Sequence, residues 1–113
     1  MTETILTAAS IPYKHGRFLN PPAETYAIIF DRQEADGPDP VTPLASAGFP
    51  RIIHHDVMVE LYEPRPDPAA EAAIEAELDA RGLPWTKEAR YWLPNVQRYQ
   101  VVYGFNYTDK RRT

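Results

Sequence analysis

The clearest signal along the chain is an alternation of apolar and polar positions near its C-terminal end. In residues 98–108 one parity holds only aromatic and aliphatic side chains, and most positions between them are polar. The apolar set comprises Tyr99, Val101, Tyr103, Phe105 and Tyr107. Because successive side chains of a strand point to opposite faces, this pattern predicts a strand with one buried and one wet face, as in an antiparallel sheet.

Two other segments also predict strands. Residues 25–31 are rich in aromatic and β-branched side chains between turn-forming residues. Residues 51–63 form a longer strand, whose odd positions are the better core candidates. These are Ile53, His55, Val57, Val59 and Leu61. Residues 13–19 predict a short strand and residues 85–93 a mixed one.

A helix is predicted over about residues 68–81. Asp67 is a good N-cap, and Pro68 falls at the first helical position, where its missing N–H costs nothing. Strong helix formers follow, and Gly82 with Pro84 ends the helix. A second, short helix is expected at residues 3–9.

The order of these elements predicts an α+β fold in one domain spanning residues 1–113. We expect a mostly antiparallel sheet of about four to five strands, with the main helix packed on one face and a short N-terminal helix. Residues 32–50 show neither period and are rich in proline, so they predict a long loop. Its apolar residues Val41, Leu44 and Phe49 either return to the core or contact a partner.

Composition and net charge exclude several classes of function and of binding site. The net charge of −4 lacks the basic footprint of nucleic-acid binding, so no sequence-specific nucleic-acid contact is expected, and residues 110–112 are interpreted as a solvated cationic end. The absence of cysteine excludes disulfides and thiolate zinc sites. No apolar run approaches the ~20 residues of a membrane helix, so no membrane contact is expected.

The strongest candidate for a metal or proton-transfer site is the triplet His54-His55-Asp56, because such sites are built from imidazole and carboxylate groups. Strand geometry lets His54 and Asp56 share a face but turns His55 away. A metal would need a further ligand, for which His15 is the remaining histidine. A small metal-dependent enzyme using His54 and Asp56 is therefore the alternative to a subunit contact formed by the triplet together with Arg51.

Other catalytic sets are missing from the sequence. Glu71, Glu75 and Asp79 have helical i, i+4, i+8 spacing and predict a solvated acidic face, or a surface for a basic partner. The two serines, Ser10 and Ser46, lack a G-x-S-x-G setting, and no glycine-rich phosphate loop is present. We expect no catalytic residues and no cofactor.

The order of motifs along residues 11–108 resembles a family of small tailed-phage proteins, described as tail terminators or minor capsid proteins. No single motif is specific, and the order and spacing carry the resemblance. The matching positions are Ile11-Pro12-Tyr13 with His15 and Phe18, Pro21-Pro22, residues 26–30, residues 59–62, Asp67-Pro68, Gly82-Leu83 and residues 99–107. The short N-terminal helix and the long proline-rich loop depart from the family pattern.

The resemblance implies a structural virion protein located in the tail or neck and assembled in the cytoplasm of a bacterial host. Such proteins form a ring, typically a homo-hexamer, on the tail tube protein. The ring ends tail polymerisation and presents a surface to the head completion or connector protein. A heterologous interface whose rotation closes makes such a ring.

Two alternative functions are also consistent with the sequence. Another head–tail neck component of similar fold would share these features, and so would a host-encoded protein-binding module. The histidines at 54 and 55 also suggest the hypothesis that assembly depends on pH, since imidazole titrates near ~6.5.

Overall fold

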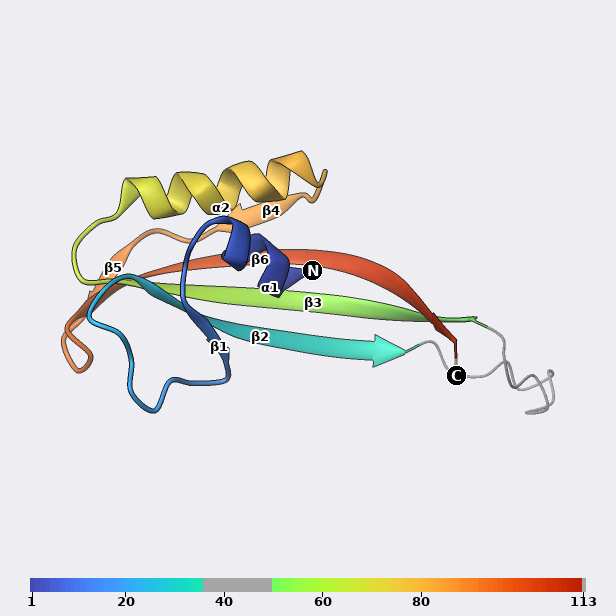
Figure 1. Ribbon diagram of the computed structural model, residues 1–113, viewed down its shortest axis with the longest axis horizontal. Helices are drawn as coiled ribbons and strands as arrows, with labels where there is room; N and C mark the ends of the chain where they lie inside the picture. Colours follow the sequence, from blue (N-terminus) through green and yellow to red (C-terminus); the bar gives the residue numbers. More distant parts are fainter. Residues whose placement is uncertain (36–49, 113) are drawn as a thin grey trace.

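One sheet organises the molecule. The computed structural model describes the backbone of residues 1–35 and 50–112, and the side chains of 1–35 and 52–109. Within these residues, two helices, α1 (Thr2–Ala8) and α2 (Pro68–Ala80), accompany a six-stranded sheet (Figure 1). The strands are β1 (Tyr13–His15), β2 (Tyr26–Ala35), β3 (Pro50–Glu63), β4 (Trp85–Lys87), β5 (Tyr91–Leu93) and β6 (Arg98–Arg112).

The strand order is β1-β2-β3-β6-β4, and β5 also pairs with β6. Only the β1–β2 pair is parallel among the described strands. This confirms the predicted α+β fold with its mostly antiparallel sheet, its main helix and its short N-terminal helix. The described strands number six, where about four to five were expected, because residues 85–93 form two short strands against β6.

The core lies on the sheet face that carries the helices. Every odd position of β3 from 53 to 63 is buried, as are Val101, Tyr103 and Phe105 opposite them on β6. Ile5 and Leu6 of α1 are buried against this face. The period-two alternation of the sequence therefore identified the buried face correctly.

Local signals set both ends of α2. The Asp67 carboxylate accepts a hydrogen bond from the backbone N–H of Ala70 (3.1 Å), and Pro68 is the first helical residue. Gly82 follows the helix with φ +66°, a left-handed conformation that glycine adopts without strain. Ile74 and Leu78 bury the apolar side of the helix. Among the described residues, neither helix is long and apolar enough to cross a membrane.

Several predicted boundaries were wrong. The strand expected at 13–19 ends at His15. Of the loop expected at 32–50, residues 32–35 belong to β2 and residue 50 belongs to β3. β6 continues to Arg112, four residues beyond the predicted end at 108, because the backbone of residues 110–112 pairs with residues 50–52. Where β2, β3 and β6 run longer than predicted, cross-strand hydrogen bonding extends them through residues whose own pattern does not predict a strand.

Candidate interaction surface

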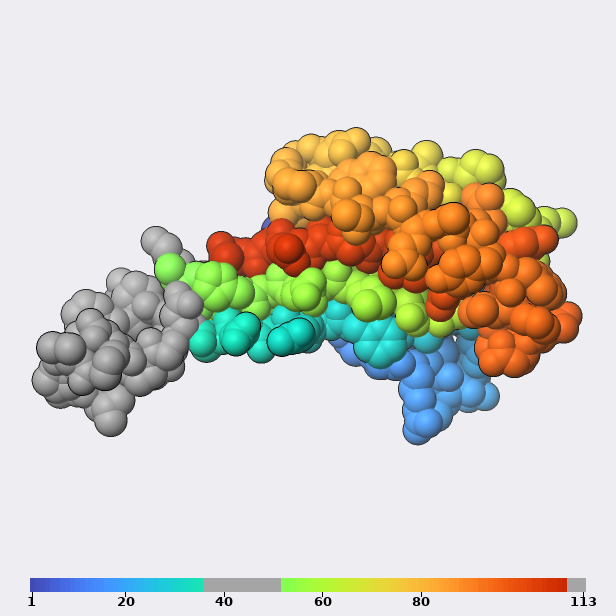
Figure 2. Space-filling model, turned by 180° about the vertical axis from the view of Figure 1, so that it is seen from behind, coloured from blue at the N-terminus to red at the C-terminus, as the bar shows by residue number. Residues whose placement is uncertain are grey.

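Three strands run past the helices and form what we call the arm. It consists of residues 30–35 of β2, residues 50–57 of β3 and residues 105–112 of β6, aligned in continuous register. In Figure 1 the helices lie over the other half of these strands and over the base of the arm, where Val57 and Phe105 belong to the core, and the distal part of the arm projects beyond the helices. Figure 2 shows the opposite face, where the three strands lie side by side with no helix across them. We call that side the open face.

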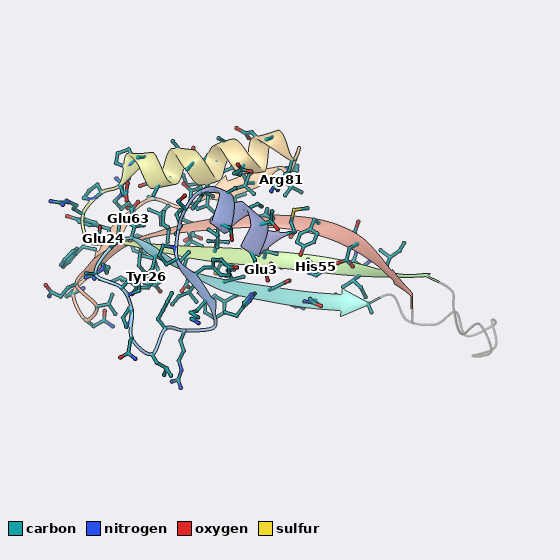
Figure 3. All side chains as sticks on the ribbon, viewed as in Figure 1. Glu3, Glu24, Tyr26, His55, Glu63 and Arg81 are labelled. Carbon is teal, nitrogen blue, oxygen red and sulfur yellow. The ribbon has the colours of Figure 1, made fainter. Side chains whose placement is uncertain are left out.

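The triplet that sequence analysis singled out lies on the arm. His54 and Asp56 are exposed on the open face, whereas His55 is 3% exposed and points to the helix-bearing face. The predicted division of the triplet between two faces is confirmed. Figure 3 shows His55 on β3 beside α1. His55 is therefore a buried residue beneath the surface that carries His54 and Asp56.

The imidazole of His55 joins all three strands of the arm. Its Nδ1 lies 3.0 Å from both carboxylate oxygens of Asp31 on β2, and its Nε2 lies 3.0 Å from Asp109 on β6. The ring stacks on Tyr107 with 4.2 Å between centroids. We call this Asp31–His55–Asp109 group the histidine clamp, because one ring on β3 lies within hydrogen-bonding distance of carboxylates on both β2 and β6.

Sequence reasoning missed both carboxylates of the clamp. Asp31 is the last residue of the strand predicted at 25–31, and Asp109 falls just after the strand predicted at 98–108; they lie 24 and 54 positions from His55. Their juxtaposition follows from the strand register, which pairs Asp31 with Val57 and Asp109 with Ile53. The two pairs flank the His55 row on the same face, and no local pattern could reveal that.

The open face mixes apolar and polar rows. Phe30 and Met58 are register partners and are 43% and 45% exposed. In the next row Arg32, Asp56 and Asn106 are aligned across the three strands. With its amide nitrogen turned toward β3, Asn106 donates to Asp56 Oδ1 (2.9 Å).

A hollow of about 540 Å³ lies along these strands, and its lining includes Arg32, Glu34, His54, Asp56 and Asn106. Its described lining is dominated by polar side chains from all three strands. Such a surface suits contact with another protein more than enclosure of an apolar ligand.

A second charged group lies at the other end of β3, where Figure 3 places Glu63. Glu63 is fully buried, and Arg90 donates to it through Nε (3.1 Å). A second nitrogen of Arg90 makes a short contact with Glu71 of α2. The guanidinium thus bridges two buried carboxyl groups between strand and helix.

The two carboxyl groups differ in their acidity. Burial, reinforced by the adjacent Glu71, raises the pKa of Glu63 to about 7. Burial opposes ionisation of Glu71 too, but hydrogen bonds with Glu63, Arg90 and Lys87 outweigh it and lower the pKa of Glu71 to about 2. Below about pH 7 Glu63 therefore holds a proton, while Glu71 beside it stays ionised.

The acidic side of α2 is not the solvated face that its spacing predicted. Glu71 is 4% exposed, and Lys87 of β4 lies 2.9 Å from it and 2.7 Å from Glu75. Glu75 also accepts a hydrogen bond from the Tyr103 hydroxyl (2.6 Å), and Asp79 accepts one from Trp85 Nε1 (2.8 Å). Spacing placed these carboxylates on one helix face correctly, but contacts with β4 and the segment after it bury Glu71 and half-bury Glu75, and leave only Asp79 exposed.

This buried group has perturbed acid–base behaviour but no route for a substrate. Glu63 has no exposed surface, so a bound molecule would have to displace the helix to reach it. Its contacts join α2, β3, β4 and residue 90, which is the pattern of a structural network. The arm is therefore the candidate interaction surface.

The metal hypothesis finds no support in the geometry. Over the described residues, no group of three or more histidine, aspartate and glutamate side chains lies close enough to hold a metal ion. His15, the further ligand that was considered, bonds to Glu3 of α1 (2.9 Å).

The remaining predicted contact residues are only partly placed. Val41, Leu44 and Phe49 lie outside the described residues. Arg51 is described through its backbone, which pairs with Arg111 on the arm. Compared with models of protein families and with curated proteins, the sequence matches none.

Proposed function

We propose that this protein is a structural component of a tailed-phage virion. It forms a ring on the end of the tail tube, stops tail polymerisation and presents the joining surface to the head connector. The proposal rests on one observation, the arm. This three-stranded projection has an open face and outer edges that are not covered by any described helix. The family resemblance along residues 11–108 supplies the assignment to the tail.

The surface of the arm supports an assembly role. A ring subunit needs surfaces for its two neighbours, for the tube and for the neck. The exposed Phe30–Met58 pair and the polar row around Asp56 combine apolar area with specific polar groups, as in protein–protein interfaces. His54 and Asp56 take the contact role expected for the triplet, while His55 stiffens the arm beneath them.

The proposed partners are further copies of the chain, which form a homo-hexamer, together with the tail tube protein and the head completion or connector protein. The proposal assigns no catalytic step and no cofactor. A neck component of similar fold is the neighbouring assignment, and it differs in binding the connector but not the tube.

The test combines solution mass with binding to tail tubes. We expect light scattering to give a multiple of the 12.9 kDa chain, negative-stain images to show rings, and the rings to bind the ends of purified tubes. Rings that bind the connector and ignore tubes would move the protein to the neck. A chain that binds neither would overturn the proposal.

A further inference from the structure

Each outer strand of the arm has an unpaired edge. β1 pairs with β2 only at residues 27–29, whereas β2 runs on to Ala35. On the other side, β5 and β4 pair with β6 at residues 98–100 and 103–105, whereas β6 runs on to Arg112. Among the described residues, no strand pairs with the outer side of residues 30–35 or of residues 106–112. Such edges are templates for pairing with another chain.

The direction of the backbone groups follows from the pairing nearer the helices. Ala27 N–H and Ile29 C=O both bond on the β1 side, so the alternate residues Asp31, Gln33 and Ala35 direct their N–H and C=O outward. On β6, the carbonyl of Val102 accepts from Glu88 N–H on the outer side. Asn106 and Thr108 continue that parity, so their backbone groups also point outward.

The two edges fit each other in direction. β2 and β6 are each antiparallel to β3, so they run the same way. A second copy rotated about an axis along the strands therefore brings its β2 edge beside the β6 edge of the first, in parallel pairing. Each joined pair still presents one unused edge of each kind, so the contact is heterologous and repeats.

The edges also differ in charge. By residue type, the β2 edge contains Asp31, Arg32 and Glu34, and is acidic overall. The β6 edge ends in three consecutive cations, at positions 110–112, after Asp109. Pairing of unlike edges brings opposite net charges together, whereas pairing of two β6 edges brings two cationic segments together. The histidine clamp holds both edges flat against β3, which lowers the entropy lost on association.

We propose that copies of this protein join by parallel strand addition, with the outer edge of β2 from one copy paired to the outer edge of β6 from the next. This names the subunit contact of the proposed ring and so rests on the proposed function.

Proline at an outward position tests the contact, because it removes an outward N–H and leaves the hydrogen bonds to β3 intact. We expect Gln33→Pro and Thr108→Pro each to lower the mass in light scattering to that of a monomer. The controls Gln33→Thr and Thr108→Val change the side chain but keep the N–H, and should remain assembled. Circular dichroism and thermal unfolding verify that each variant is folded.

Mixing the two proline variants gives the sharper result. Gln33→Pro retains an intact β6 edge and Thr108→Pro an intact β2 edge, so the mixture should form a one-to-one heterodimer and nothing larger. Dimers in either variant alone would indicate pairing of like edges and overturn the proposal. Assembly that survives both substitutions, with tube binding intact, would overturn the edge pairing but leave the proposed function standing.

A charge reversal serves as the second variant if proline unfolds the arm. We expect Glu34→Lys to raise the dissociation constant between copies about threefold to tenfold, because it removes an acidic residue opposite a cationic edge. Glu24→Lys makes the same change at an exposed site outside the arm and should have no effect. An equal effect of both substitutions would contradict edge-specific attraction.

Discussion

At the scale of single residues, two ionisable side chains decide how the long strands are held. His55 is placed between carboxylates from both neighbouring strands, and Glu63 shares a proton with a helix carboxylate at the other end of β3. Both are polar groups at odd positions of β3, where the alternation of apolar and polar residues predicts core residues. Their burial is tolerated because each has charged hydrogen-bonding partners.

Replacement of His55 by leucine should strongly destabilise the fold. The change removes the ring that both Asp31 and Asp109 contact, and loss of one partner from a buried hydrogen-bonded pair costs about 1–3 kcal/mol. Urea unfolding would measure this cost. The exposed His15–Glu3 pair is the matched control, because His15→Leu should cost about 0–1 kcal/mol. Equal costs would show that the clamp adds nothing to a surface pair.

Glu63 should make stability depend on pH. Its pKa in the folded protein is raised from 4.5 to about 7, so its contribution is fully present below pH 4.5 and is lost as pH rises through 7. Glu71, with its pKa lowered to about 2, contributes above pH 4.5 and loses that contribution as pH falls toward 2. Together the pair predicts greatest stability near pH 4.5, with a decline as pH rises from 4.5 through 7 and as pH falls toward 2.

The substitution Glu63→Gln isolates this effect, because glutamine keeps the shape of the protonated acid and does not titrate. Between pH 5 and 9 the free energy of unfolding of the wild type should fall relative to the variant by up to about 3 kcal/mol. Chemical unfolding at several pH values measures the difference, in which groups common to both proteins cancel. A constant difference across this range would contradict a raised pKa at Glu63.

At the scale of elements, α2 depends on Asp67 for more than its cap. The same carboxylate accepts from Ala70 N–H and from the Thr25 hydroxyl (2.6 Å), which lies just before β2. One side chain therefore begins the helix and fastens it to the sheet.

Asp67→Ala should lower the free energy of unfolding by about 1–2 kcal/mol, since it removes the cap and leaves the Thr25 hydroxyl without that acceptor. Asp67→Asn retains an oxygen that can accept from Ala70 N–H and should cost less. Thermal unfolding compares them. Equal losses in the two variants would indicate that charge, and not the capping geometry, is the stabilising feature.

At the scale of the whole molecule, the two faces of the sheet have different tasks. The helix-bearing face forms the core, whereas the open face exposes Phe30 and Met58. Adjacent residues of β3 should therefore respond oppositely. Val59→Ala should cost about 2–3 kcal/mol of stability, because Val59 is 2% exposed, and Met58→Ala should cost less than about 1 kcal/mol. Denaturant unfolding of unassembled protein measures both, and a large cost at Met58 would show that the open face is covered.

The alternation of residues 53–63 and 98–108, the cap at Asp67 and the left-handed Gly82 were sufficient to predict the α+β fold, the buried face of the sheet and α2. These features are local, because strand and helix periodicity and capping depend on neighbours a few positions away. Only the tertiary structure revealed the extended ends of β2 and β6, the partners of His55 and the cover over Glu71. Each arises where register or packing brings together residues that are distant in the chain, and strands in a sheet take their ends from their partners as much as from their own residues.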